Sequence, residues 1–260
     1  MSFADRIAFI TGASSGIGWE VAKELARQGC KVGLVARRQE ALEKLADEIA
    51  THGGVAASAP ADVSDRKQVQ SAFRELADRL GPCDLLVANA GVGVPSFIEP
   101  FNIADVERMI RVNLFGVIYA VEAVLPAMLR RGSGHLAAVS SLAAYKGLPV
   151  ESGYCASKAA VNTYMESLRI QLRYRGIHVT TICPGFVRTP MTEVNQFHMP
   201  WLMEADEAAR RIVRALARRK KVYNFPWQTT LLMKVTRWLP DWVIAQAMAG
   251  YDKSLPRPGA

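Results

Sequence analysis

Three side chains in the stretch from Ser140 to Lys158 could act together on one carbonyl group. They are a hydroxyl, a phenol and an ammonium, supplied by Ser141, Tyr154 and Lys158. Tyr154 and Lys158 are four residues apart, and on a helix this separation places two side chains on one face with their Cβ atoms about 5–6 Å apart. A nearby cation favours the phenolate and so lowers the pKa of a phenol. The spacing therefore predicts that Tyr154 is a general acid or base near neutral pH.

A tyrosine followed four positions later by a lysine also occurs by chance, so the rest of the chain has to support this interpretation. The chain has 260 residues, of which 50% are apolar and 22% charged. This composition is typical of a globular protein with one large domain and a substantial core.

The first residues do not resemble a signal peptide, because Asp5 and Arg6 are charged where a signal peptide would be apolar. We expect no membrane-spanning helix, since no run reaches the about 20 apolar residues that such a helix needs.

The cysteines give no sign of a metal site. Their positions lack the spacing of metal ligands, and we therefore expect reduced thiols in a cytoplasmic protein and no bound metal. The four residues are Cys30, Cys83, Cys155 and Cys183.

A glycine-rich turn follows a predicted strand at residues 6–11 and precedes a predicted helix at residues 19–29. The turn contains Gly12, Gly16 and Gly18. Residues without side chains let the backbone approach a pyrophosphate, and a helix N-terminus offers unpaired N–H donors and a positive dipole end. The context therefore predicts a dinucleotide-binding turn.

The end of the next predicted strand, residues 31–36, bears on the choice of cofactor. In dinucleotide-binding folds an acidic residue at this point holds the ribose 2′-hydroxyl of NAD. This chain has Ala36, Arg37 and Arg38 there instead, and a guanidinium can bind a phosphate through two hydrogen bonds. We therefore predict NADP(H) over NAD(H). The alternative is that both arginines are solvated residues at the start of a helix, because arginine is usually exposed.

Strands and helices continue to alternate after this point, with strands predicted at residues 55–63 and 83–91. Regular alternation implies right-handed crossovers and one parallel sheet. Ligands bind such sheets at the carboxyl ends of the strands. The glycine turn, Asp62 and residues 89–91 would all lie there, although Asp62 could instead cap the helix that follows it.

Asn113 stands in the middle of a long predicted helix, residues 105–132. Asparagine is a mediocre helix former whose amide competes for backbone hydrogen bonds. We therefore expect a local irregularity or a buried polar role at this position. A strand ending at Ser140 and Ser141 follows, then a loop, and then a helix at residues 153–176 that carries Tyr154 and Lys158.

In their order and spacing these motifs resemble the short-chain dehydrogenase/reductase family in its small, single-domain form. The resemblance covers residues 5–190 and rests on residues 11–18, Asp62, residues 89–91, Asn113, Ser141, residues 154–158, Pro184, Gly185 and Thr189. It implies an α/β fold, in which a Rossmann-like, doubly wound parallel sheet of about seven strands is flanked by helices. The chain, residues 1–260, would then be one such domain with a C-terminal helical tail.

The resemblance also implies roles for the matching residues. Tyr154 would be the general acid in reduction and the general base in oxidation, while Lys158 would lower its pKa and hold the hydroxyls of the nicotinamide ribose. Ser141 would hydrogen-bond the substrate oxygen, and Asn113 would hold a water that links Lys158 to solvent. Ser140 is expected to be structural or to assist Ser141. The implied cofactor-binding residues are Gly12, Ser14, Ser15, Gly16, Ile17, Gly18, Arg37, Arg38, Asp62, Val63, Asn89, Ala90, Gly91, Tyr154, Lys158, Pro184, Gly185, Val187 and Thr189.

The C-terminal part carries most of the net charge of +8, since residues 205–260 contain 11 Lys and Arg but 4 Asp and Glu. Residues 186–225 are predicted to form a substrate lid and a basic helix, followed by a short edge strand at residues 222–225. The Met- and aromatic-rich residues 191–205 would cover an apolar pocket, because methionine adapts to irregular ligands, or belong to the ordinary core.

Residues 226–260 are predicted to be an amphipathic extension that carries Trp227, Trp238 and Trp242. Three interpretations stay open. The extension could pack on its own or a neighbouring subunit as a cover of the pocket, or lie on an anionic membrane surface with tryptophan at the interface. Its charge could also serve only solubility. Nucleic-acid binding is not expected, since no motif for it is present.

The function predicted from the sequence is NADP(H)-dependent hydride transfer to or from the carbonyl or secondary alcohol of an apolar small molecule. The alternative is a catalytically idle nucleotide-binding sensor or scaffold, against which the intact set of Ser141, Tyr154 and Lys158 argues. The resemblance implies a homodimer or homotetramer, paired through the helices that begin near Asn113 and Tyr154. The expected location is cytoplasmic, or peripheral on a membrane if the tail binds lipid.

Overall fold

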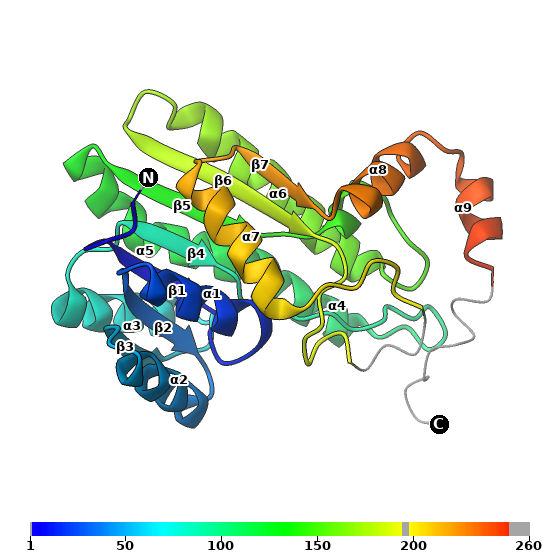
Figure 1. Ribbon diagram of the computed structural model, residues 1–260. Helices are drawn as coiled ribbons and strands as arrows, with labels where there is room; N and C mark the ends of the chain where they lie inside the picture. Colours follow the sequence, from blue (N-terminus) through cyan, green and yellow to red (C-terminus); the bar gives the residue numbers. More distant parts are fainter. Residues whose placement is uncertain (1, 194–197, 250–260) are drawn as a thin grey trace.

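The structure, a computed structural model, describes residues 2–193 and 198–249 of the chain. Its centre is a sheet of seven parallel strands in the order β3-β2-β1-β4-β5-β6-β7, with helices on both faces (Figure 1). The strands are β1 (Ile7–Thr11), β2 (Lys31–Ala36), β3 (Ala56–Pro60), β4 (Leu85–Ala88), β5 (Gly134–Val139), β6 (Ile177–Pro184) and β7 (Val222–Phe225). This architecture confirms the doubly wound, Rossmann-like fold predicted from the sequence.

The helices alternate with the strands up to β7, and two more follow it. They are α1 (Gly16–Arg27), α2 (Gln39–Thr51), α3 (Arg66–Leu80), α4 (Ile103–Ile110), α5 (Gly116–Arg131), α6 (Ser152–Gln171), α7 (Ala205–Ala217), α8 (Trp227–Thr236) and α9 (Asp241–Ala247). Apolar residues of α1, α2 and α7 form the core on one face of the sheet, while those of α3, α5 and α6 form the core on the other. Every residue of β1 and β4 is buried, which is why these strands read as continuous apolar runs.

The predicted basic helix is α7, and its apolar side is part of the core. Ile212, Val213 and Leu216 are fully buried and pack in the layer that contains α1. The basic residues lie on the outer side, where Arg210 and Arg211 pair with acidic residues one turn earlier. The edge position of β7 also agrees with the sequence expectation.

The position of the ligand crevice follows from the strand order. The chain runs from β1 to β2 and β3 on one side of the sheet, and then returns to β4 on the other side of β1. Thr11 at the end of β1 is level with Val35 in β2 and Ala88 in β4. The connections after β1 and β4 therefore leave in opposite directions, and they open a crevice at the carboxyl ends of these strands.

The long helix around Asn113 is irregular, as the sequence predicted. A π-helical turn, Arg111–Phe115, separates α4 from α5, and Asn113 within it is fully buried. The hydropathy of one helix was underestimated from the sequence: among the described residues, the segment Ile103–Arg131 is long and apolar enough to cross a membrane. In the fold, α5 lies on the sheet, and Val117, Val121 and Met128 are part of the core. The hydropathy of this helix therefore serves the core of the domain.

The C-terminal helices α8 and α9 lie beyond the edge strand and project from one end of the sheet (orange and red in Figure 1). They are attached to the loop after β5, because the Lys146 Nζ donates to the Leu239 carbonyl at 3.3 Å and to the Asp241 carboxylate at 2.8 Å. Residues 194–197 of the predicted lid and residues 250–260 of the predicted extension lie outside the described residues.

Gly18 in the first turn of α1 offers a test of this arrangement. A Cβ atom at this position would overlap the Gly12 carbonyl oxygen and the Asn89 amide. In an open helix, Gly→Ala stabilises by up to about 1 kcal/mol, but overpacking here should reverse the sign. We expect Gly18→Ala to lower the free energy of unfolding by about 2–3 kcal/mol in a denaturant titration.

The matched control is Gly147→Ala, because no neighbouring heavy atom lies within 4 Å of the corresponding Cβ position. This variant should unfold like the wild type. A stabilised Gly18→Ala protein would mean that α1 does not approach the turn this closely.

Candidate active site

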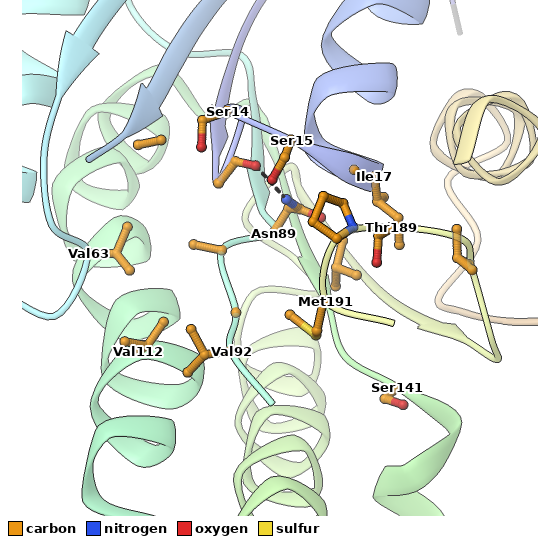
Figure 2. Close-up of a pocket in the computed structure, with 18 of the residues that line it drawn as sticks. Ser14, Ser15, Ile17, Val63, Asn89, Val92, Val112, Ser141, Thr189 and Met191 are labelled. Atoms are coloured by element: carbon orange, nitrogen blue, oxygen red, sulfur yellow. Dashed lines mark hydrogen bonds between the residues drawn. The ribbon is translucent and has the colours of Figure 1, made fainter. Parts of the chain in front are cut away.

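A cavity of about 320 Å³ lies at the carboxyl ends of the strands. Ser14, Ser15 and Ile17 of the glycine turn border it on one side (Figure 2). Val63, Val92 and Val112 line the opposite wall, while Met191 lies between the turn and Ser141. The cavity therefore joins segments that the sequence treated as separate motifs.

Nearly all of the predicted site residues line this one cavity. They are Gly12, Ser14, Ser15, Gly16, Ile17, Arg37, Arg38, Asp62, Val63, Asn89, Ala90, Gly91, Ser141, Tyr154, Lys158, Pro184, Gly185, Val187 and Thr189. Two predicted residues lie behind its wall. Gly18 provides the space for the contact between α1 and the turn, and Asn113 is buried beneath the loop after β4.

The glycine turn is held in place by the end of β4. Gly12 has a φ of +68°, a conformation that side-chain-bearing residues rarely adopt. The Asn89 amide donates to the carbonyls of Thr11 and Gly12 at 3.1 and 3.3 Å, and the Thr11 hydroxyl accepts the backbone N–H groups of Asn89 and Ala90. Ser15, the N-cap of α1, makes no side-chain cap, and the first turn of the helix has no acidic residue. Its N–H groups therefore suit a pyrophosphate.

The two arginines after β2 are both engaged at the rim of the cavity. The Arg38 guanidinium donates to the carbonyl and the hydroxyl of Ser14 at 3.0 and 3.1 Å. The Arg37 guanidinium lies 3.9 Å from the Asp62 carboxylate and is otherwise largely exposed. Both arginines are exposed at the start of α2, as in the alternative interpretation, and Arg38 is in addition hydrogen-bonded to the glycine turn.

Asp62 does not cap the helix that follows it. Its carboxylate accepts hydrogen bonds from the backbone N–H of Ser64 at 2.9 Å and from the Ser64 hydroxyl at 2.7 Å. The N-cap of α3 is Asp65, which accepts from the backbone N–H groups of Lys67 and Gln68. The capping alternative for Asp62 is thus wrong, and its side chain stays at the cavity rim.

Tyr154 and Lys158 lie one turn apart on α6, as predicted, but their electrostatics differ from the sequence expectation. Burial raises the pKa of Tyr154 to about 12, and a hydrogen bond with Ser141 offsets part of this increase. The Lys158 Nζ lies 5.7 Å from the centroid of the phenol ring and donates to the Val139 carbonyl at 3.0 Å. The lowering of the phenol pKa by this ammonium stays a prediction from the spacing.

Lys158 itself is almost completely buried, and burial lowers its pKa to about 8. Its main-chain carbonyl accepts a hydrogen bond from the Ser140 hydroxyl at 3.0 Å. Ser140 therefore ties the end of β5 to α6, which is the structural role expected for it. Ser141 begins a 3₁₀ turn, Leu142–Tyr145, by accepting the backbone N–H of Ala143.

Asn113 connects the loop after β4 to α6. Its amide group donates to the Val92 carbonyl and the Ser157 hydroxyl, both at 2.9 Å, and its oxygen accepts the Val92 N–H at 2.8 Å. Ser157 in turn donates to the Tyr154 carbonyl at 2.7 Å. Both amide hydrogens are thus used within the protein, and the side chain positions the loop and α6. A water held for Lys158 stays a prediction from the resemblance.

Several lining residues were not predicted from the sequence. They are Ala36, Ala61, Val92, Val112, Val139, Ser140, Pro190, Met191 and Thr192. Most of them are neighbours of predicted residues in the chain, so adjacency to a motif was the available signal. Met191 lies in the predicted lid, whereas Thr192 has a local role: its hydroxyl donates to the Val187 carbonyl at 2.7 Å and so fixes the turn above the cavity.

Comparisons with known proteins agree with this geometry. Residues 6–199 match the family described as short chain dehydrogenase. An uncharacterized oxidoreductase of Myxococcus xanthus (strain DK1622) is 39% identical over 236 residues, which are 91% of this chain and 93% of that protein. A crystal structure of a short-chain type dehydrogenase/reductase from Mycobacterium marinum matches with a TM-score of 0.81 and 28% identity, over 86% of this chain and 95% of that chain.

The crystal structure of levodione reductase also matches, with a TM-score of 0.81 and 27% identity, over 88% of this chain and 99% of that chain. Three findings indicate the same family. The family match spans most of the sheet, the relative covers nearly the whole chain, and the two crystal structures have a similar fold. The chain therefore belongs to the short-chain dehydrogenase/reductase family of oxidoreductases, which bind a nicotinamide cofactor.

Proposed function

We propose that this protein is an NADP(H)-dependent oxidoreductase that acts on the carbonyl or secondary alcohol of an apolar small molecule. The observation that carries the proposal is the arrangement of one cavity. Its rim at the end of β2 holds two arginines, its wall is the glycine turn, and its far end holds Ser141, Tyr154 and Lys158. A bound nicotinamide would supply the hydride chemistry, while the protein supplies position and charge.

The protonation states of the three polar groups suit the reduction of a carbonyl. A phenol with a pKa of about 12 carries its proton at neutral pH and can donate it to an oxygen that gains negative charge. Lys158, whose pKa is about 8, is mostly an ammonium at the same pH and adds positive charge to this end of the cavity. The Ser141 hydroxyl, which hydrogen-bonds Tyr154, is placed to orient the reacting oxygen.

An apolar substrate is supported by the surroundings of Tyr154. Gly93 lies beside both the phenol ring and Met191, since a Cβ atom at Gly93 would be 3.4 Å from the ring and 3.6 Å from the Met191 sulfur. Val92 and Val187 line the same cavity. Thioether and aliphatic walls favour apolar ligands. The similarity to levodione reductase supports a ketone as the class of substrate.

NADP(H) rather than NAD(H) is supported by the charges near the end of β2. Ala36, the last residue of the strand, provides no carboxylate for a ribose 2′-hydroxyl, and Arg37 and Arg38 follow it. A 2′-phosphate would replace the long contact between Arg37 and Asp62 with a shorter, charge-assisted hydrogen bond. The competing hypothesis, a nucleotide sensor without turnover, makes no use of the polar groups at the far end of the cavity.

Tyr154→Phe tests the proposed acid/base residue. The substitution removes the proton that is transferred but keeps the ring that packs beside Met191. We expect kcat for NADPH oxidation with a panel of ketones to fall by about 10²–10⁴-fold, while the Kd for NADPH changes little. Tyr145→Phe is the control, because that phenol donates to Asn224 outside the cavity lining.

Undiminished turnover in Tyr154→Phe would remove Tyr154 from the mechanism. If the wild type binds NADPH but turns over none of the ketones, alcohols and aldehydes offered, the sensor hypothesis replaces the enzyme.

Arg37→Ala and Arg38→Ala test the cofactor preference. Removing a charge-assisted hydrogen bond should weaken NADPH binding by roughly 10- to 100-fold, and NADH binding should be nearly unchanged because it has no 2′-phosphate. The measurement is a fluorescence titration of each protein with each nucleotide. Arg79→Ala is the control, since Arg79 pairs with Glu75 on α3, away from the cavity. Equal affinity of the wild type for both nucleotides would contradict the proposal.

A further inference from the structure

The exposed side of α8 is apolar, the reverse of the usual pattern for a surface helix. Trp227, Leu231, Val235 and Trp238 follow one another at helical spacing and are 70%, 56%, 51% and 86% exposed. Residues separated by three or four positions form one stripe on a helix. Trp238 lies two residues beyond the end of α8. Leu232 of α8 and Trp242 of α9 are also exposed and extend the apolar area. We call these six residues the tryptophan patch.

The side of α8 that faces the protein is polar by comparison. Thr229 is buried and Thr230, Met233 and Thr236 are half-buried, with the hydroxyls of Thr230 and Thr236 donating to the backbone carbonyls of Pro226 and Met233. A helix of a globular domain normally turns its apolar face toward the core and its polar face toward water. A helix whose apolar stripe faces solvent therefore indicates a surface that binds another molecule.

The charges beside the tryptophan patch are positive. Lys234 and Arg237 are exposed and lie along one edge of the stripe, each within four positions of Trp238. The only acidic residue within α8 and α9 is Asp241, and the Lys146 ammonium pairs with it at 2.8 Å. A partner of this surface should therefore offer an apolar region to the tryptophan patch and negative charges to the basic residues beside it.

From this combination we infer that α8 and α9 dock on an anionic lipid bilayer. Tryptophan is favoured at the boundary between headgroups and acyl chains, and basic residues beside it attract acidic headgroups. A second copy of the chain fits less well. A symmetric contact between two such faces would bring the positive charges of both copies together, with no free carboxylate on either α8 or α9 to compensate them.

The location of α8 gives the docking a consequence for the cavity. Pro226 and Thr229 lie 3.2 and 3.4 Å from the position of a Cβ on Gly185, which lines the cavity. Pro226 and Thr229 therefore lie directly behind the cavity wall at Gly185, whereas Trp227 points away from it and is 70% exposed. Docking would hold the cavity close to the bilayer surface, where an apolar substrate concentrates. This consequence depends on the proposed function, whereas the docking does not.

Co-sedimentation of the full-length protein with vesicles tests the inference. The vesicles are phosphatidylcholine with or without phosphatidylglycerol. We expect the wild type to bind the anionic vesicles. The double variant Trp227→Ser/Trp238→Ser should bind at least about tenfold more weakly, because it lacks two side chains that would insert into the bilayer interface. The matched control is Val55→Ser/Tyr174→Ser, which removes two exposed apolar residues from distant parts of the chain and should bind like the wild type.

The charge of the surface is tested separately. Lys234→Gln/Arg237→Gln should weaken binding to anionic vesicles by about fivefold for each residue and leave binding to neutral vesicles unchanged. Equal binding of the wild type and the tryptophan variant, or no binding of the wild type, would overturn the inference. So would a wild-type oligomer that the tryptophan variant dissociates in gel filtration, because the patch would then be an interface between copies.

A NADPH titration of the same variants separates this test from the proposed function. The substituted residues lie outside the cavity lining, so nucleotide affinity should be unchanged in all of them. Failure of vesicle binding with intact nucleotide binding and turnover would refute the docking alone.

Discussion

The close approach of α1 to the turn after β1 is the constraint on which the site depends. Gly18 faces the Gly12 carbonyl at a distance that excludes any side chain, and the Asn89 amide donates to the same carbonyl. This contact fixes three things at once: the start of α1, the path of the turn and the end of β4. The backbone N–H groups at the start of α1 and the carboxyl ends of the strands therefore face one cavity. The hydrogen-bond donors for a ligand are oriented before the ligand binds.

The polar groups at the other end of the cavity are positioned in a similar way, through hydrogen bonds that do not touch the ligand. Asn113 joins the loop after β4 to Ser157, and Ser157 donates to the carbonyl of Tyr154. The π-helical turn around Asn113 gives its side chain this direction, and π-helical turns often occur at functional sites. A helix interruption, which costs some stability, thus connects the loop after β4 to the helix that carries Tyr154.

The fold and the positions of most lining residues could be predicted from the sequence because both depend on local patterns. Alternating apolar periods specify the parallel sheet, and a parallel sheet brings every motif after a strand to one edge. The hydrogen-bond partners of the site residues depend on three-dimensional packing and could not be predicted from the sequence. The spacing of Tyr154 and Lys158 gave their common face but not the hydrogen bond from the Lys158 ammonium to the Val139 carbonyl. The choice between Asp62 and Asp65 as the cap of α3 also needed the path of the chain.

The C-terminal helix shows why periodicity alone does not reveal orientation. The spacing of Trp227, Leu231, Val235 and Trp238 predicts one apolar face, and the default assumption is that this face is buried. The described residues already form cores on both faces of the sheet, and α8 begins beyond the edge strand, where Thr229 is buried against the domain. The sheet therefore offers no further apolar layer to α8. Among the described residues this apolar face stays exposed, and the basic residues at its edge favour an anionic surface as its partner.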